Sequence, residues 1–162
     1  MTRLQEKLGL LFDEAIKLEL NAAELYTIFN ETFKEDSDFW WRLILEEKSH
    51  ASLLESGKNN FAPRGFFPFE LLSAPLEELT AANRDVEKLI GRYRKSPPTR
   101  EEAFNVALLF EKFAGEVHFQ KFMEQDSDSK LTDMFKHLNR DDKDHEKRII
   151  SYMEKNRIRI ND

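Results

Sequence analysis

The chain has 162 residues, no cysteine, and 25 Lys and Arg against 31 Asp and Glu, which gives a net charge of −6 at neutral pH. This length allows one domain with a sizeable hydrophobic core. The lack of cysteine excludes disulfides, thiolate-held metal sites and a cysteine nucleophile, and it fits a cytoplasmic protein. The acidic balance argues against nucleic acid as a partner. No apolar run reaches the roughly 18 residues that a membrane helix needs, so no membrane association is expected.

The composition predicts an all-α protein, because Leu, Glu, Lys and Phe are abundant whereas only five glycines and five prolines occur. Apolar residues recur at a period near 3.6 in four segments. Thr2 is expected to cap the first helix, and Thr99 with Glu102 has the pattern of a capping box at the third. The four helices are expected at about 2–33, 37–56, 99–125 and 129–156.

The connection between the second and third predicted helices, residues 57–98, is much longer than the other two. Its second half, "LEELTAANRDVEKLIGRYRK", predicts an extra helix. Short links at the other junctions predict antiparallel neighbours, and about 40 residues are more than enough to return along a bundle of roughly 30 Å. This order of short, long and short connections is typical of a four-helix bundle with one crossover, formed by a single domain over residues 1–162.

The apolar stripes of the first and third helices are interrupted near their middles by acidic residues. Glu19 and Tyr26 are seven residues apart in the first stripe, and Glu111 and His118 occupy the matching positions in the third. A seven-residue step returns to the same helix face, so both carboxylates are expected on the buried side.

The second and fourth helices each carry a carboxylate and a histidine where two central apolar residues would stand. The pairs are Glu47 with His50 and Asp142 with His145, each at i and i+3. This spacing places both side chains of a pair on one helix face, about 4.5 Å apart along the axis. Taken alone, such a pair is more often a feature of the solvated surface. The other polar groups on the apolar stripes favour a buried site.

Four carboxylates that face one buried centre repel one another and need compensating charge. Two divalent cations cancel four carboxylates, and two neutral imidazoles complete their coordination. Oxygen ligands with one nitrogen per metal suit iron or manganese, and zinc is tolerated. One Glu from each of two helices and a carboxylate-x-x-His from each of the others is the pattern of carboxylate-bridged di-metal bundles.

Four motifs in order, "ELNAAELY" at 19–26, "EKSH" at 47–50, "EKFAGEVH" at 111–118 and "DKDH" at 142–145, give the chain its resemblance to a known family. The chain resembles the ferritin-like di-iron superfamily and, within it, the rubrerythrin-like proteins. The resemblance spans all four helices and implies a ferritin-like bundle that holds two iron ions. By position it makes Glu19 and Asp142 terminal ligands, Glu47 and Glu111 bridging ligands, and His50 and His145 ligands to one metal each.

The chain departs from the family pattern at three points. Asp142 stands where the family has Glu, so the second metal could be held more loosely or through a water. Ala114 occupies the position of a further family carboxylate, which puts one redox-linked ligand switch in doubt. The Cys-x-x-Cys rubredoxin module is absent. The resemblance therefore implies a separate electron donor, such as a rubredoxin-like protein, and a homodimer is one candidate assembly.

Tyr26 and His118 are the candidate catalytic residues next to the ligands. Tyr26 is expected to donate a hydrogen bond to a ligand carboxylate, and the alternative is a half-buried core tyrosine. His118 has three interpretations: an extra ligand, a proton donor to bound peroxide, or a hydrogen-bonded core residue. Rival carboxylates also exist, of which Glu24 and Glu116 are expected to face outward and Glu46 is not excluded.

The function that the resemblance implies is redox chemistry of a non-haem di-iron centre with hydrogen peroxide or O2. Rubrerythrin-like peroxide reduction and ferroxidase-type iron oxidation are the two candidate reactions. A non-catalytic protein that binds or handles iron or zinc is the alternative. A third hypothesis, a metal-free helical interaction module, leaves the six core-facing polar groups without a purpose.

Overall fold

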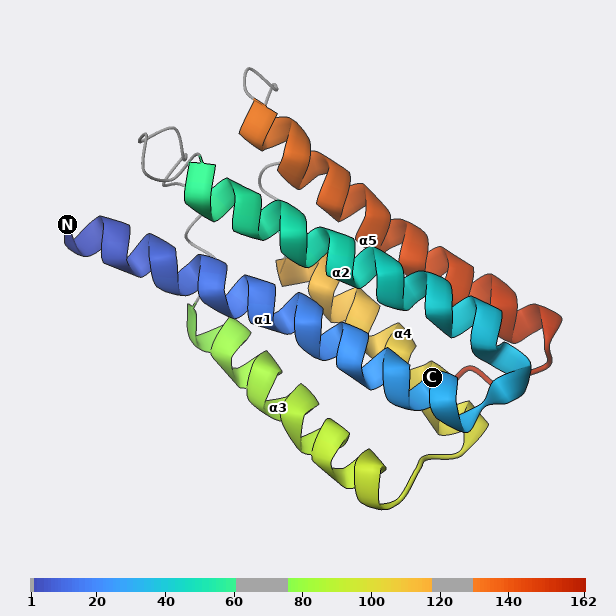
Figure 1. Ribbon diagram of the computed structural model, residues 1–162. Helices are drawn as coiled ribbons and strands as arrows, with labels where there is room; N and C mark the ends of the chain where they lie inside the picture. Colours follow the sequence, from blue (N-terminus) through green and yellow to red (C-terminus); the bar gives the residue numbers. More distant parts are fainter. Residues whose placement is uncertain (1, 61–75, 118–129) are drawn as a thin grey trace.

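The computed structural model describes residues 2–60, 76–117 and 130–162 (Figure 1). Within these ranges the chain is helical and contains no strand, which confirms the predicted all-α class. No described helix combines the length and the hydropathy that crossing a bilayer would require. The elements are α1 Arg3–Thr32, the 3-10 helix η1 Lys34–Asp36, α2 Ser37–Asn60, α3 Leu76–Lys95, α4 Arg100–Val117 and α5 Lys130–Lys155.

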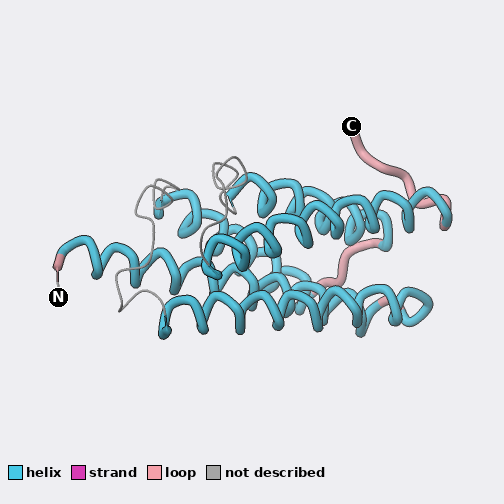
Figure 2. The backbone as a smooth tube through the Cα atoms, turned by 90° about the horizontal axis from the view of Figure 1, so that it is seen from above, coloured by secondary structure: helices cyan, strands magenta, loops and turns pink. Residues whose placement is uncertain are grey.

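Helix α1 lies at the centre of the contacts. It packs against α2 and α3, while α4 packs against α5 and α2 also contacts α5. Figures 1 and 2 show the helices with their long axes roughly aligned, and α3 lies along α1 on the side away from α2. The extra helix predicted within the long connection is therefore present, and it adds a layer next to α1.

Local capping signals fix two of the helix starts. The Thr2 hydroxyl accepts from the Gln5 amide, and the Gln5 side chain accepts from the Thr2 amide, which completes a capping box. At α4 the Thr99 hydroxyl accepts from the Glu102 amide at 3.2 Å. The Glu102 carboxylate accepts from the Tyr93 hydroxyl at 2.9 Å and so ties α4 to α3.

The end of α2 differs from the prediction. The helix continues to Asn60, whereas the sequence predicted an end at about residue 56 because Gly57 follows. A glycine within a helix costs only about 1 kcal/mol relative to alanine, and Gly57 is buried among other residues. The predicted continuation of the third helix beyond Val117, over residues 118–125, lies outside the described residues.

A buried carboxylate joins three elements at one end of the molecule. Asp36 is 1% exposed and accepts two hydrogen bonds from Arg100, from Nε at 2.8 Å and from Nη2 at 2.6 Å. The Tyr152 hydroxyl donates to the same carboxylate at 2.7 Å. These bonds connect the turn after α1 with the first residue of α4 and with the last turns of α5.

We expect Asp36→Ala to destabilise the fold by about 3 kcal/mol, because it leaves the Arg100 guanidinium and the Tyr152 hydroxyl without their shared acceptor. Arg100 remains 34% exposed, so water recovers part of the loss. The midpoint of thermal unfolding should fall by about 6–12 °C. Glu35→Ala is the control, since the Glu35 carboxylate is exposed and 3.9 Å from Arg100. Equal melting temperatures for the two variants would contradict this account.

Candidate metal centre

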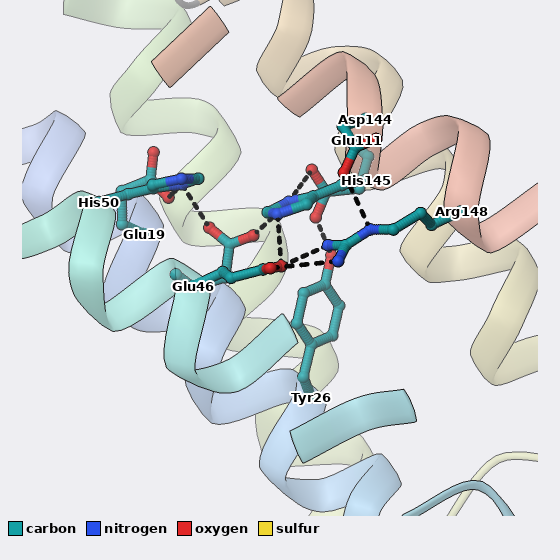
Figure 3. A network of polar contacts seen from close by, with 9 residues as sticks. Glu19, Tyr26, Glu46, His50, Glu111, Asp144, His145 and Arg148 are labelled. Carbon is teal, nitrogen blue, oxygen red and sulfur yellow. Dashed lines mark hydrogen bonds and ion pairs between the residues drawn. The ribbon is translucent and has the colours of Figure 1, made fainter. Parts of the chain in front are cut away.

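Five of the six predicted metal ligands lie together in the interior, and they come from four helices (Figure 3). Each is only 1–2% exposed to solvent. Periodicity explains their burial, because each occupies a position in an apolar stripe that points toward the other helices. They are Glu19 on α1, Glu47 and His50 on α2, Glu111 on α4 and His145 on α5.

The five side chains form two groups that share one carboxylate. In the first group, His50 Nδ1 is 3.6 Å from an oxygen of Glu19 and 3.6 Å from Glu47 Oε2. In the second, His145 Nδ1 is 3.0 Å from Glu47 Oε1 and 3.4 Å from Glu111 Oε2. One ligand atom from each member of a group lies within 4.8 Å of the others, a spacing that could hold a metal ion. The two oxygens of Glu47 therefore face different histidines.

The second group contains polar atoms that a metal ion would satisfy. Glu47 Oε1, Glu111 Oε2 and His145 Nδ1 are buried, and they have no hydrogen-bond partner among the described residues. Their separations of 3.0–3.4 Å allow attraction between charges, but the atoms are not aligned for hydrogen bonds. Buried polar atoms are rarely left in this state. A cation between them would accept all three lone pairs, so the residues fit a carboxylate–histidine metal site.

Without a metal, the histidines supply the charge that balances the carboxylates. Burial lowers the pKa of His50, but Glu19 and Glu47 raise it more, to about 11. The pKa of His145 is also raised, because Glu111, Glu46 and Glu47 outweigh the effect of burial. Burial and the negative charge of Glu47 raise the pKa of Glu111. Both imidazoles are therefore protonated at neutral pH, and their positive charge offsets part of the negative charge of the carboxylates.

Tyr26 lies directly against the second group. Its side chain is fully buried, and its hydroxyl donates to Glu111 Oε1 at 2.5 Å. Burial, followed by the charges of Glu111 and Glu47, raises the pKa of Tyr26 well above 10, so the phenol stays protonated and remains a donor. A hydrogen bond to the second oxygen of a ligand carboxylate fixes the orientation of that carboxylate.

Glu46 and Arg148 form a second layer of polar contacts around His145, and the sequence did not predict this role for them. Glu46 Oε2 lies 2.9 Å from His145 Nε2, and Arg148 donates to the same carboxylate (Figure 3). Arg148 is itself held by Asp144, 3.1 Å from its Nε. Burial acts to raise the pKa of Glu46, but His145 and Arg148 lower it to about 2. Glu46 thus contacts the ring nitrogen opposite the one that faces Glu47, and it orients the imidazole.

The structure describes only parts of the remaining predicted residues. Asp142 lies in α5, one helical turn before His145, and its side chain is outside the described residues. His118 as a whole and the side chain of Glu116 are outside them as well. The Glu24 side chain is 45% exposed, as expected for an outward-facing residue.

No family model, no curated protein and no solved structure matches this chain. The case for a metal centre therefore rests on the geometry of five buried side chains and on three buried atoms that find no hydrogen-bond partner in the described part of the chain. Buried carboxylates and histidines at this spacing could hold a metal ion, whatever its identity.

Metal binding is expected to release protons, because a metal needs neutral imidazoles and the pKa values of both His50 and His145 are raised. At pH 7 the release should approach about two protons per chain, and the apparent affinity should fall as the pH is lowered.

The stability of the metal-free protein depends on pH in the opposite direction. The contribution of His50 to stability is complete below its unfolded pKa of 6.5 and is lost as the pH rises through about 11.

Isothermal titration calorimetry in buffers of different ionisation enthalpy measures this release directly. A binding enthalpy that does not depend on the buffer would show that no proton leaves, and it would contradict the assignment of both histidines as ligands.

Proposed function

We propose that the chain is a ferritin-like non-haem di-iron protein that carries out redox chemistry with hydrogen peroxide or O2. In this proposal α1, α2, α4 and α5 form the four-helix bundle, and α3 belongs to the crossover between α2 and α4. The observation that carries it is the position of Glu47, whose two oxygens face two separate histidines and belong to both carboxylate–histidine groups. A carboxylate shared by both groups would place two metal ions next to each other, as in two-metal sites.

The ligand assignment follows the two groups and the resemblance in the sequence. One iron would be held by Glu19, Glu47 and His50, and the other by Glu47, Glu111 and His145. The resemblance further implies that Glu111 bridges both ions and that Asp142 is a terminal ligand of the second. Carboxylate oxygens with one imidazole nitrogen per ion suit iron, and manganese or zinc fits the same donors.

When bound, two neighbouring iron ions would supply the electrons that reduce the oxidant. The chain itself supplies position and protection. Tyr26 donates to Glu111 and holds its carboxylate in one orientation. Glu46, supported by Arg148, contacts Nε2 of His145 and keeps Nδ1 directed at Glu47 and Glu111. Burial of Tyr26, Glu111 and His145 keeps bulk water away and strengthens their electrostatic interactions.

Electrons would come from a separate donor, because this sequence contains no cysteine for an iron–thiolate module. Peroxide reduction and ferroxidase-type oxidation remain the two candidate reactions. Ala114 replaces a carboxylate that the rubrerythrin-like proteins use in a ligand switch, so a reaction here would proceed without that switch.

The test is rapid mixing of the anaerobic Fe(II)-loaded protein with hydrogen peroxide or O2, followed by absorption in the near ultraviolet. We expect oxidation within seconds with at least one oxidant. Glu111→Ala should slow it at least ~100-fold, because it removes a ligand of the second group. Glu24→Ala, which removes a half-buried carboxylate that pairs with Arg94 of α3, should react like the unaltered protein. Iron that binds but stays ferrous would favour the non-catalytic alternative, a protein that handles iron or zinc.

A further inference from the structure

A continuous series of aromatic rings runs from the candidate metal centre to the surface. The ring of Tyr26 lies 5.7 Å from that of Trp40, measured between centroids. Trp40 lies 4.5 Å from Phe104 and 5.2 Å from Phe39. Both phenylalanines adjoin Tyr152, at 5.4 Å for Phe104 and 4.3 Å for Phe39, and both stack on it. Two parallel bridges therefore connect Trp40 with Tyr152.

The two ends of this series share a chemical feature that packing alone does not require. Each tyrosine hydroxyl donates to a buried carboxylate: Tyr26 to Glu111 at 2.5 Å and Tyr152 to Asp36 at 2.7 Å. A phenol that loses an electron becomes a strong acid, so its oxidation needs a proton acceptor within hydrogen-bond distance. Trp40 differs, because its indole Nε1 is buried with no hydrogen-bond partner among the described residues. An indole can pass charge as a cation without releasing its proton.

The outer end of the series opens into a pocket. Phe39 and Tyr152 line a pocket of about 590 Å³, a size that suits a small molecule. Exposed Arg42, Lys147 and Lys155 also line it, against one exposed acidic residue. The excess of positive charge favours an anionic occupant.

We propose that Tyr26, Trp40 and Tyr152 form an electron route by which a small anionic one-electron reductant, docked beside Tyr152, reduces the buried centre. The function of this route rests on the proposed redox chemistry, in which hydrogen peroxide or O2 is the oxidant. Tyr26 gives one electron to the oxidised centre and its phenolic proton to Glu111. Trp40 then reduces the Tyr26 radical, which takes its proton back.

The remaining steps return the route to its starting state. Tyr152 reduces the Trp40 cation and passes its proton to Asp36. The docked donor then reduces the Tyr152 radical, and the proton returns from Asp36 to the phenol. In sum, the donor loses one electron and the centre gains one, while each aromatic residue is restored.

The third tyrosine in the chain provides an internal comparison. Tyr93 also donates to a carboxylate, that of Glu102, and Phe29 separates its ring from Trp40 at centroid distances of 5.9 and 5.0 Å. Among the described residues, a single ring, that of Phe29, connects Tyr93 with Trp40, and Tyr93 does not line the pocket beside Tyr152. The proposal therefore assigns no transfer to Tyr93.

The route can be tested without any metal, which separates its failure from failure of the proposed function. Because the chain has no cysteine, Ser151→Cys creates a single attachment point at the pocket for a ruthenium photo-oxidant. The metal-free protein used for the test also carries Tyr93→Phe. After flash oxidation, its electron paramagnetic resonance spectrum should show a tyrosyl signal with a component from Tyr26. Tyr26→Phe should remove this component, and Trp40→Phe should reduce it at least tenfold.

Two further proteins serve as controls for the role of Trp40. Trp41→Phe changes the exposed neighbour of Trp40 and should leave the Tyr26 component unchanged. If Trp40→Phe fails to fold, fluorinated tryptophan can be incorporated into the Trp41→Phe chain, in which Trp40 is the remaining tryptophan. Fluorination raises the reduction potential of Trp40 without altering its shape, and the Tyr26 component of the signal should again fall. A signal that Tyr26→Phe does not change, or a Tyr26 component that survives both changes at Trp40, would overturn the route.

The docking of an anionic donor is measured on the same photogenerated radical. Ascorbate should quench the Tyr152 signal, and Lys147→Glu should slow this quenching several-fold, whereas quenching by a neutral hydroquinone should be unaffected. Equal rates with ascorbate before and after the charge reversal would contradict the anionic class of the donor.

Discussion

Replacement of Glu47 by alanine is expected to reduce the metal content from two ions per chain to less than one. The reason is its shared position, because Glu47 Oε2 faces His50 and Oε1 faces His145, so one substitution removes a ligand from both groups. Loss of an orienting partner alone typically costs 10–100-fold in metal affinity, and loss of a ligand common to two ions should cost at least ~100-fold for each. Elemental analysis after dialysis against a weak chelator measures the content.

Two matched variants show whether the effect belongs to the shared ligand. Glu46→Gln alters the neighbouring carboxylate, which contacts the outer nitrogen of His145 and accepts from Arg148, and should lower the affinity of one site by about tenfold. Glu24→Ala alters a half-buried carboxylate on α1 that pairs with Arg94, away from both groups, and should retain both ions. A Glu47→Ala protein that keeps two ions per chain would refute the proposed bridging role.

Metal loading is expected to raise the midpoint of thermal unfolding by more than 10 °C. A ligand that binds only the folded chain at 1,000 times its dissociation constant contributes about 4 kcal/mol per site. For a chain of this size each kcal/mol corresponds to about 2–4 °C, so one occupied site gives about 8–16 °C. Calorimetric scans of the metal-free and the anaerobic Fe(II)-loaded protein provide the measurement.

The pH dependence of this stabilisation is a further check. It should be smaller at pH 6 than at pH 8, since protons on His50 and His145 compete with the metal. It should also nearly vanish in Glu47→Ala. A midpoint that does not respond to metal at either pH would mean that the five buried groups bind no ion in the folded state.

Local patterns in the sequence predicted most of the helical framework. The N-caps at Thr2 and at Thr99 and the extra helix in the long connection are all present. These features depend on neighbours within about four residues, so they are readable from sequence. The extension of α2 past Gly57 was missed, because the burial of Gly57 among other residues, and not its local preference, allows the helix to continue.

The candidate site was predicted to a similar extent. Helical periodicity brought Glu19, Glu47, Glu111 and the two histidines onto buried faces, and the structure places them together. Periodicity could not show which carboxylate each imidazole nitrogen would face. Glu46 was therefore only a rival ligand in the sequence, although it contacts His145 from the other side with support from Arg148.

Contacts between distant segments were the least predictable. Asp36 is part of a charged turn, "KEDSD", which reads as solvent-exposed, yet it is buried beneath Arg100 and Tyr152. Those partners are 64 and 116 residues away, so no local pattern indicates the contact. The same holds for the aromatic series, in which Trp40, Phe104 and Tyr152 meet only after three helices have packed.

The most direct test of the di-iron proposal is the iron content per chain after iron-replete expression and anaerobic purification. Two irons per chain are expected, in line with two carboxylate–histidine groups that share Glu47. A content of one iron per chain, or of none, would contradict the proposal.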